Sequence, residues 1–522
     1  MCISLAVLFL LSFFSGPIRA QDPSQLLLDG DDAFRAGKFD EAATKYRAVL
    51  DAEPRNVDAR YWLTRTLLEK GEASEALAAI EQGLQWEPED PVFLQGLGEV
   101  RYRMGEIEEA RTSFLAALGH DSNLPRARLG LAKVLIGEGR YKSAKFHLQR
   151  AYELDPNDPE IILAWSRTFS GGQDEIALLR RYLELTKNET PEHMDYVRSY
   201  LEFLENREGR GMCKLSSGTL PAQVTIVEDS SSGLPKRDEF RTLYPASRMI
   251  LPAPFVQAAF NGSKTRTLLL DTGASGILLS ERVAQDAGIR LVAKTYVGGI
   301  GSQGRRKAYF GVADRIRIGN LEFRDCAVTV TPGQYVPRDG LIGADFFSRF
   351  LIALDLPGLT LRLDSYPEAQ AIADDPQLLW QHDRKLTGDR AKFEPARRSG
   401  GHLLIRTRIN KVQAGWFLLD TGAAINVASL QTAKKVTQTS KDQNTVVQGV
   451  SGPAGTYESQ SITMEFAAFR QANFKMITLD MKGKSKTRDF ELAGLLGYPT
   501  LRLFSIQIDY LNVAVNFTYA PK

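Results

Sequence analysis

Residues 24–207 place apolar and polar side chains with the period of an α-helix. Phe39, Ala42, Tyr46 and Leu50 form an apolar stripe at helical spacing, with charged residues between them. This pattern recurs every 34 residues, and small residues keep the phase: Gly37, Gly71, Gly105 and Gly139, then Ala42, Ala76, Ala110 and Ala144. The same 34-residue period places Pro54, Pro88 and Pro156, and Ser122 stands at the matching position in the third unit. The region is therefore predicted to be an array of helical units.

A 34-residue period with this placement of Gly, Ala and Pro resembles the tetratricopeptide (TPR) repeat, in which each unit is two antiparallel helices. Gly ends the first helix, Ala allows close helix packing, and Pro begins the next unit. We predict a TPR domain over residues 24–207, whose fifth, degraded unit at about 160–207 acts as a cap. Because solenoids commonly bind proteins on their concave side, we expect a protein partner there; a rigid spacer or a dimerisation element is the alternative.

The C-terminal half has the pattern of β-hairpins, and it has it twice. Residues 255–260 and 268–270 read as two strands joined at Asn261-Gly262, and residues 403–409 and 416–419 repeat the arrangement around Asn410-Lys411. Each second strand runs directly into the same tetrapeptide: Asp271-Thr272-Gly273-Ala274 and, 149 residues later, Asp420-Thr421-Gly422-Ala423. A carboxylate at the end of a buried strand is costly, so two such carboxylates are expected to meet.

The segments after the two motifs also correspond. Each half has a Gly-rich stretch, at residues 297–301 and 448–452, where glycine permits the positive φ of a mobile hairpin tip. Asp339-Gly340-Leu341-Ile342-Gly343 and Ala493-Gly494-Leu495-Leu496-Gly497 then follow, each ahead of a closing strand. The two halves are therefore predicted to be homologous all-β lobes.

The order of these motifs resembles the retropepsin-like aspartyl proteases, over roughly residues 248–366 and 401–522. The resemblance implies a multidomain fold: an all-α TPR solenoid followed by two all-β acid-protease-like lobes. It implies catalysis by Asp271 and Asp420, and support of the active-site loops by Thr272, Gly273, Thr421 and Gly422. It also implies two substrate-covering flaps, whose candidate residues are Gly298, Gly299, Ile300, Gly301, Gly449 and Val450.

Two close carboxylates that share one proton can activate water, so an aspartic-type endopeptidase needs no acyl-enzyme and no cofactor. Ala274 and Ala423 stand where pepsin-like chains carry a hydroxyl donor. Fewer donors raise the apparent pKa values of the pair, so we expect activity at weakly acidic to near-neutral pH. Ser275-Gly276 differs from Ala424-Ile425-Asn426, which predicts an active site that is not symmetric.

Two alternatives stay open at the level of the sequence. We expect the lobes to pair within one monomer, whereas a homodimer would build its active sites between chains. The second alternative is a catalytically inactive peptide-binding scaffold. Both motifs keep Asp, Thr and Gly, which argues against the loss of a catalytic site. The substrate expected for an active enzyme is a peptide or a protein.

The remaining segments indicate export. Residues 1–20 read as a signal peptide, because the apolar run is too short for an ordinary membrane span. We expect a periplasmic or extracellular protein, with an uncleaved membrane anchor as the alternative. Cys213 and Cys326 either form one disulfide or stay free. Residues 208–247 are predicted to be a linker that includes one strand, residues 222–227, of the first lobe, and residues 367–400 a polar connector between the lobes.

Composition and charge argue against two kinds of ligand, nucleic acids and metal ions. The 522 residues carry a formal charge of +2, with acids and bases interspersed, so we expect no nucleic-acid partner. The five histidines lie far apart without metal-ligand spacing, so we expect no metal.

Overall fold

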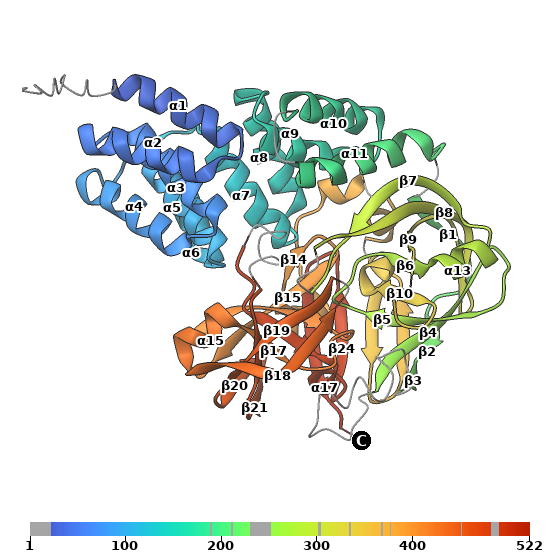
Figure 1. Ribbon diagram of the computed structural model, residues 1–522. Helices are drawn as coiled ribbons and strands as arrows, with labels where there is room; N and C mark the ends of the chain where they lie inside the picture. The colour runs from blue at the N-terminus through green and yellow to red at the C-terminus, as the bar shows by residue number, and fades with distance from the viewer. Residues whose placement is uncertain are drawn as a thin grey trace, which may run out of the picture.

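The computed structural model describes residues 22–187, 191–209, 212–229, 252–300, 304–333, 336–366, 369–375, 377–449, 451–481 and 490–521. The leader predicted at residues 1–20 lies outside them, as do the flap candidates Gly301 and Val450. In Figure 1 the helical array, blue to green, lies across one side of two β lobes, which are green to yellow and orange to red. No helix within the described residues is long and apolar enough to cross a membrane.

The N-terminal domain is a stack of antiparallel helix pairs, so the predicted TPR solenoid is confirmed. Its first eight helices are α1 (Pro23–Arg35), α2 (Phe39–Ala52), α3 (Val57–Lys70), α4 (Ala73–Trp86), α5 (Pro91–Arg103), α6 (Ile107–His120), α7 (Pro125–Gly137) and α8 (Tyr141–Leu154). Gly71 ends α3 with a φ of +79°, which a side chain would strain. Ala42, Ala76, Ala110 and Ala144 are fully buried, so a larger residue at these places would push the helices of a pair apart.

The solenoid continues past the four regular units. Helix α9 (Pro159–Ser166) and α10 (Gln173–Leu185) form a fifth pair, joined by the 3-10 helix η1 (Arg167–Phe169), and α11 (Pro191–Asn206) closes the array. Apolar residues of this cap, among them Tyr182, Val197 and Phe203, share a cluster with Ala293 and Val312 of the first β lobe. The cap is therefore part of an interface rather than a solvent-facing end.

Lobe 1 is built on a nine-stranded sheet. Its strands are β1 (Met212–Ser217), β3 (Val227–Asp229), β4 (Ala253–Phe260), β5 (Arg266–Asp271), β6 (Ile277–Ser280), β7 (Arg290–Val297), β8 (Arg306–Ile318), β9 (Leu321–Thr331) and β10 (Gly340–Gly343), with the short helices α13 (Glu281–Asp286) and η2 (Ala344–Phe347). Strand β10 runs parallel to β5 and antiparallel to β6, which brings Gly343 opposite Asp271.

Lobe 2 repeats this arrangement in a ten-stranded sheet. Its elements are β14 (Arg397–Ser399), β15 (His402–Ile409), β16 (Gln413–Asp420), β17 (Val427–Ser429), α15 (Leu430–Val436), β18 (Thr439–Gly449), β19 (Gly452–Ser459), β20 (Ile462–Phe466), β21 (Phe469–Asn473), β22 (Ile477–Leu479), β23 (Gly494–Gly497) and α17 (Tyr498–Leu501). Strand β23 runs parallel to β16 and antiparallel to β17, and Gly497 lies opposite Asp420. The two-lobe β architecture is therefore the predicted one.

A third sheet belongs to both lobes. It holds β2 (Ala222–Thr225), β11 (Leu351–Asp355), β12 (Thr360–Asp364), β13 (Glu394–Pro395), β24 (Phe504–Asp509) and β25 (Ala514–Tyr519). The closing strand of lobe 1, β11, pairs antiparallel with the closing strand of lobe 2, β24, with Ile352 opposite Ile508. Backbone hydrogen bonds thus hold the two lobes together within one chain.

The two segments predicted to be linkers contribute to the fold. Residues 208–247 supply β1, β2 and β3, and a disulfide joins Cys213 to Cys326 in β9. Residues 367–400 hold α14 (Gln370–Asp374), η3 (Leu378–Gln381) and η4 (Gly388–Lys392). This connector also caps α8 of the solenoid: Ser143 donates to the Asp383 carboxylate from its amide at 3.1 Å and from its hydroxyl at 2.7 Å.

Candidate active site

The two Asp-Thr-Gly loops meet at the boundary between the lobes. The hydroxyl of Thr272 donates to the Leu419 carbonyl at 2.8 Å, and the hydroxyl of Thr421 donates to the Leu270 carbonyl at 2.6 Å. Each threonine amide also donates to the other threonine's hydroxyl, at 3.0 Å in both directions. Because both threonines are buried, these four hydrogen bonds lock each loop to the opposite lobe.

The two predicted catalytic carboxylates share this site. A methyl group placed on Gly273 would lie 2.4 Å from Cγ of Asp420, and one placed on Gly422 would lie 2.5 Å from Cγ of Asp271. Each carboxyl group therefore lies directly against the backbone of the other lobe's motif, at a distance that only glycine allows. The Gly273 amide donates to Oδ1 of Asp271 at 2.8 Å, which orients that carboxylate. Asp420 is only 8% exposed, so its carboxyl group is largely shielded from water.

The turn that follows each motif is supported differently in the two lobes. In lobe 1 the Gly276 amide donates to Oδ1 of Asp345 at 2.8 Å, and the Gly343 amide donates to the Gly276 carbonyl at 2.7 Å. In lobe 2 the direction is reversed: the Gly497 amide donates to the side-chain oxygen of Asn426 at 2.9 Å. The loop of lobe 1 therefore rests on a carboxylate, whereas that of lobe 2 rests on a neutral amide.

Asp345 is the titratable group of this support. Burial raises the pKa of Asp345 to about 6, while hydrogen bonds from the Gly276 and Phe346 amides and the nearby charge of Arg398 act in the opposite direction. The charge on this carboxylate consequently changes within the weakly acidic range. Among the described residues that support the two loops, Asp345 titrates in this range, whereas the side-chain amide of Asn426 carries no titratable proton.

The two flaps touch each other. The hairpin of β7 and β8 and the hairpin of β18 and β19 bring their tips together, where the Gly299 amide donates to the Ser451 hydroxyl at 2.9 Å. In return the Ser451 amide donates to the Ile300 carbonyl at 3.0 Å. Gly449 lies so close that a methyl group on it would be 2.2 Å from that carbonyl oxygen. Ile300, Gly299 and Gly449 thus form one contact, while Gly298 is exposed beside it.

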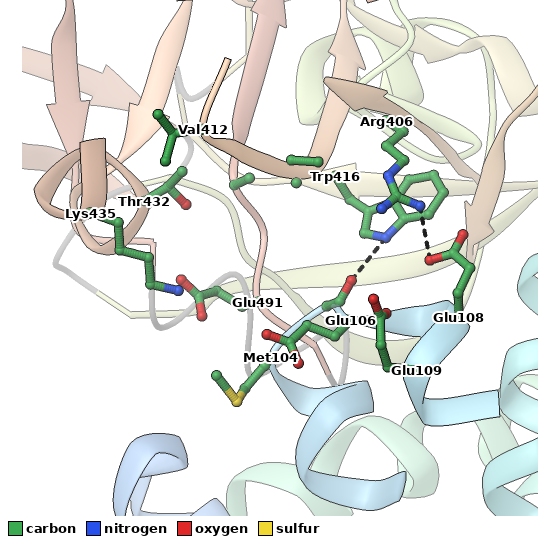
Figure 2. A pocket seen from close by; sticks show the side chains of 14 residues that line it. Met104, Glu106, Glu108, Glu109, Arg406, Val412, Trp416, Thr432, Lys435 and Glu491 are labelled. Atoms are coloured by element: carbon green, nitrogen blue, oxygen red, sulfur yellow. Dashed lines mark hydrogen bonds and ion pairs between the residues drawn. The ribbon is translucent and has the colours of Figure 1, made fainter. Parts of the chain in front are cut away.

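A pocket of about 190 Å³ lies elsewhere, where the turn between α5 and α6 meets lobe 2 (Figure 2). Trp416 donates from Nε1 to the Gly105 carbonyl at 3.1 Å, and Arg406 pairs with Glu108 at 3.0 Å. Burial raises the pKa of Glu491, which also lines the pocket. None of its described lining residues belongs to an Asp-Thr-Gly motif, so this pocket is a seam between the solenoid and lobe 2.

The residues that the sequence pattern predicts for the centre of the site lie together between the lobes, whereas the contacts around them were not predicted. The structure brings together the Asp, Thr and Gly residues of both motifs, and Leu341-Ile342-Gly343 and Leu495-Leu496-Gly497 lie under the loops as buried strands. Asp345 was missed, although a carboxylate inside the apolar run Gly343-Ala344-Asp345-Phe346-Phe347 was a usable signal. Arg398, whose charge acts on Asp345, gave no such signal, because its position depends on the path of the connector.

Two lobes of one fold, joined at a pair of interlocked Asp-Thr-Gly loops, define an aspartic-protease-like architecture. Comparison with family models agrees: residues 256–346 and 405–500 match the aspartyl protease model. Residues 33–98, 67–133 and 101–164 match the tetratricopeptide repeat model. The chain therefore carries an aspartyl protease domain preceded by TPR repeats.

Individual relatives match part of the chain. Cellulose synthase operon protein C of Pseudomonas fluorescens (strain SBW25) is 26% identical over 133 residues, which are 24% of this chain and 10% of that protein. A TPR repeat-containing protein of Pseudomonas aeruginosa is 28% identical over 177 residues, 33% of this chain and 29% of that protein. The chain thus spans less than a third of the length of these curated relatives.

Among solved structures, a thermophilic TPR protein of Thermus thermophilus is 23% identical, with a TM-score of 0.30; the match covers 35% of this chain and 99% of that one. The first TPR of Spaghetti (RPAP3), bound to an HSP90 peptide, is 22% identical, with a TM-score of 0.21; this match covers 22% of this chain and 91% of that one.

Proposed function

We propose that the protein is an aspartic-type endopeptidase in which Asp271 and Asp420 form one catalytic pair. The observation that carries this proposal is the reciprocal packing of each carboxylate against the other motif's glycine. Two carboxylates held this closely cannot both ionise at low cost, so they hold one proton between them. The ionised member accepts a proton from a bound water, and the protonated member donates to the carbonyl oxygen of the scissile peptide bond.

The surrounding residues serve this chemistry by holding geometry. The interlocked Thr272 and Thr421 keep the two carboxylates in register, so little reorganisation is needed when the water attacks. The touching flaps cover the site and exclude bulk water from it. A peptide substrate enters only when the contact between Gly299 and Ser451 opens.

The rest of the chain supports a role outside the cytoplasm. The disulfide between Cys213 and Cys326 is of the kind that persists in oxidising compartments, and the apolar leader in the sequence is consistent with export. The concave face of the solenoid is the candidate surface for a protein partner, because such faces commonly bind extended peptides.

The test is cleavage of a diverse peptide library by the full chain and by Asp271→Asn and Asp420→Asn, each with and without pepstatin. Asn keeps the size of Asp but cannot take the proton from water, so each variant is expected to lose at least about a hundredfold in rate. Asp32→Asn is the matched control, because the same chemical change falls on a carboxylate that is 78% exposed in α1.

Two outcomes would contradict the proposal. If either active-site variant cleaves at the wild-type rate, the two aspartates are not a shared catalytic pair. If the wild-type chain cleaves nothing in the library and binds peptides equally well with and without both aspartates, the lobes are a binding scaffold. Multi-angle scattering on the active fraction checks the intramolecular arrangement, since a strict monomer with full activity excludes sites built between chains.

A further inference from the structure

The connector between the lobes runs from the solenoid to the active-site loop of lobe 1. At one end, Trp380 packs edge-to-face on Tyr141, the first residue of α8, with ring centroids 5.9 Å apart, and the His382 carbonyl accepts from the Lys142 amide at 2.8 Å. At the other end, a methyl group placed on Gly401 would lie 2.0 Å from Oδ2 of Asp345 and 2.5 Å from Oγ of Ser275. The connector is therefore in contact with both domains.

Arg398 lies between these two ends. Its Nη1 donates to the Tyr141 hydroxyl at 3.4 Å, and its Nε donates to the Gly400 carbonyl at 2.8 Å. Its guanidinium lies over the ring of Tyr510, with Cζ 5.5 Å from the centroid. Burial acts to lower the pKa of Arg398, but Tyr141, Tyr510 and Asp345 raise it overall, so the side chain stays charged. One cation is thus held by a solenoid residue and in turn holds the Gly400 carbonyl, next to the Gly401 that packs against Asp345.

Asp345 is hydrogen-bonded to the active-site loop of lobe 1. Its Oδ1 accepts from the Gly276 amide, two residues beyond Ala274 of the Asp-Thr-Gly-Ala motif. Gly276 has a φ of +64°, which glycine adopts without strain, so the amide that Asp345 accepts from belongs to a tight turn. Lobe 2 has the neutral Asn426 in the corresponding role, so the link through a charge belongs to lobe 1.

We propose that Arg398 is a positioning residue of the active site: held by Tyr141 of the TPR domain, it fixes the backbone at Gly400, next to the Gly401 that packs against Asp345, and thereby the loop that carries Asp271. The proposal rests on the proposed function for its catalytic consequence, whereas the positioning of the loop is measurable without catalysis. The TPR domain is then a structural part of the lobe-1 active site, in addition to any role in binding a partner.

The charged groups around Asp345 determine the expected pH dependence. Hydrogen bonds from the Gly276 and Phe346 amides and the charge of Arg398 act to lower the pKa of Asp345. Burial, and then the charge of Asp345, raise the pKa of Tyr510, whose phenol stays neutral in the working range. The ionised carboxylate is the stronger acceptor for the Gly276 amide. Activity should therefore decline as the pH falls through about 6, where Asp345 takes up a proton. Loss of the Arg398 charge raises this pKa, which moves the decline to higher pH.

The experiment compares the full chain with Arg398→Gln, Arg398→Lys and Tyr141→Phe. Two readouts are taken between pH 4 and pH 8: kcat and KM on a peptide that the wild type cleaves, and deuterium uptake of a peptide spanning residues 271–276. Arg406→Gln is the matched control, because Arg406 also bridges lobe 2 to the solenoid, through Glu108, but is 52% exposed and outside this chain of contacts.

For Arg398→Gln we expect kcat to fall between about 10- and 100-fold and KM to stay within about twofold. The decline of activity with falling pH, called the acid limb below, should move to higher pH. Arg398→Lys keeps the charge and should restore the position of the limb but only part of kcat. Tyr141→Phe should lower kcat a few fold without moving the limb. All three should speed deuterium uptake at residues 271–276, and Arg406→Gln should change neither readout.

The proposal is overturned if Arg398→Gln matches the wild type in both readouts, or if Arg406→Gln reproduces its effects, since any loosened domain contact would then suffice. A wild-type chain without peptidase activity would refute the proposed function only. Deuterium uptake would still decide on Arg398, because faster exchange in Arg398→Gln and Tyr141→Phe supports the positioning and unchanged exchange refutes it.

Discussion

Replacing Thr421 by Val should loosen the junction of the two lobes far more than replacing it by Ser. The Thr421 hydroxyl donates to the Leu270 carbonyl and accepts from the Thr272 amide, and both threonines are buried. Val has nearly the same shape but no hydroxyl, so one carbonyl and one amide of lobe 1 lose a partner. An unsatisfied buried polar group costs about 1–3 kcal/mol, which gives a loss of about 2–6 kcal/mol for Thr421→Val.

Thr421→Ser is the control for this magnitude, since it keeps the hydroxyl and removes one methyl group, at a cost of about 1 kcal/mol. Urea denaturation, with the free energy of unfolding extrapolated to water, measures both variants. The double variant Thr272→Val/Thr421→Val should lose less than the sum of the single variants, because the two side chains share the same hydrogen bonds. Equal stabilities of Thr421→Val and Thr421→Ser would refute this account of the interlock.

Three further predictions follow from contacts of the described residues. Gly273→Ala should abolish peptide cleavage, because the new methyl group would lie 2.4 Å from the opposing carboxyl carbon; Gly119→Ala, which meets nothing within 4 Å, should leave the rate unchanged. Asp345→Asn should flatten the pH dependence of stability between about pH 4 and pH 6. The folded pKa of Asp345, about 6, lies above its ordinary value of 3.8, so its contribution to stability is complete below pH 4 and is lost as the pH rises through 6. At 1.36 kcal/mol per pKa unit this is about 3 kcal/mol, and urea midpoints that keep the wild-type slope in Asp345→Asn would contradict it. Phe203→Ala should destabilise the seam between the TPR cap and the lobe-1 flap by about 3–5 kcal/mol, because Phe203 is buried with its ring centroid 5.3 Å from that of Phe310 in β8. Hydrogen exchange of residues 290–312 measures this, and unchanged exchange there would show that the cap does not hold the flap.

The residues of the two Asp-Thr-Gly motifs could be predicted to come together because they stand in short sequence patterns that occur twice. The strand before Asp271 and the strand before Asp420 end in the same tetrapeptide, so their homology followed from the chain alone. The supports of the two loops could not be predicted in this way. Asp345 follows β10 and accepts from the lobe-1 loop, whereas Asn426 belongs to the lobe-2 loop and accepts from the end of β23, and no pattern in the chain indicates either contact.

The sequence by itself determined the elements of this protein: the 34-residue helical period, the two hairpin-and-motif halves and the carboxylates that end their strands. These features are local, and the side-chain periods of helices and strands report them directly. Only the tertiary structure decided which distant groups became partners. Thr272 and Thr421 exchange hydrogen bonds across 149 residues, and Arg398 donates to the Tyr141 hydroxyl across 257 residues because the connector passes between α8 and the lobes. The physical reason is that burial and charge pairing at a domain boundary depend on how whole surfaces pack, and no short stretch of sequence contains that packing.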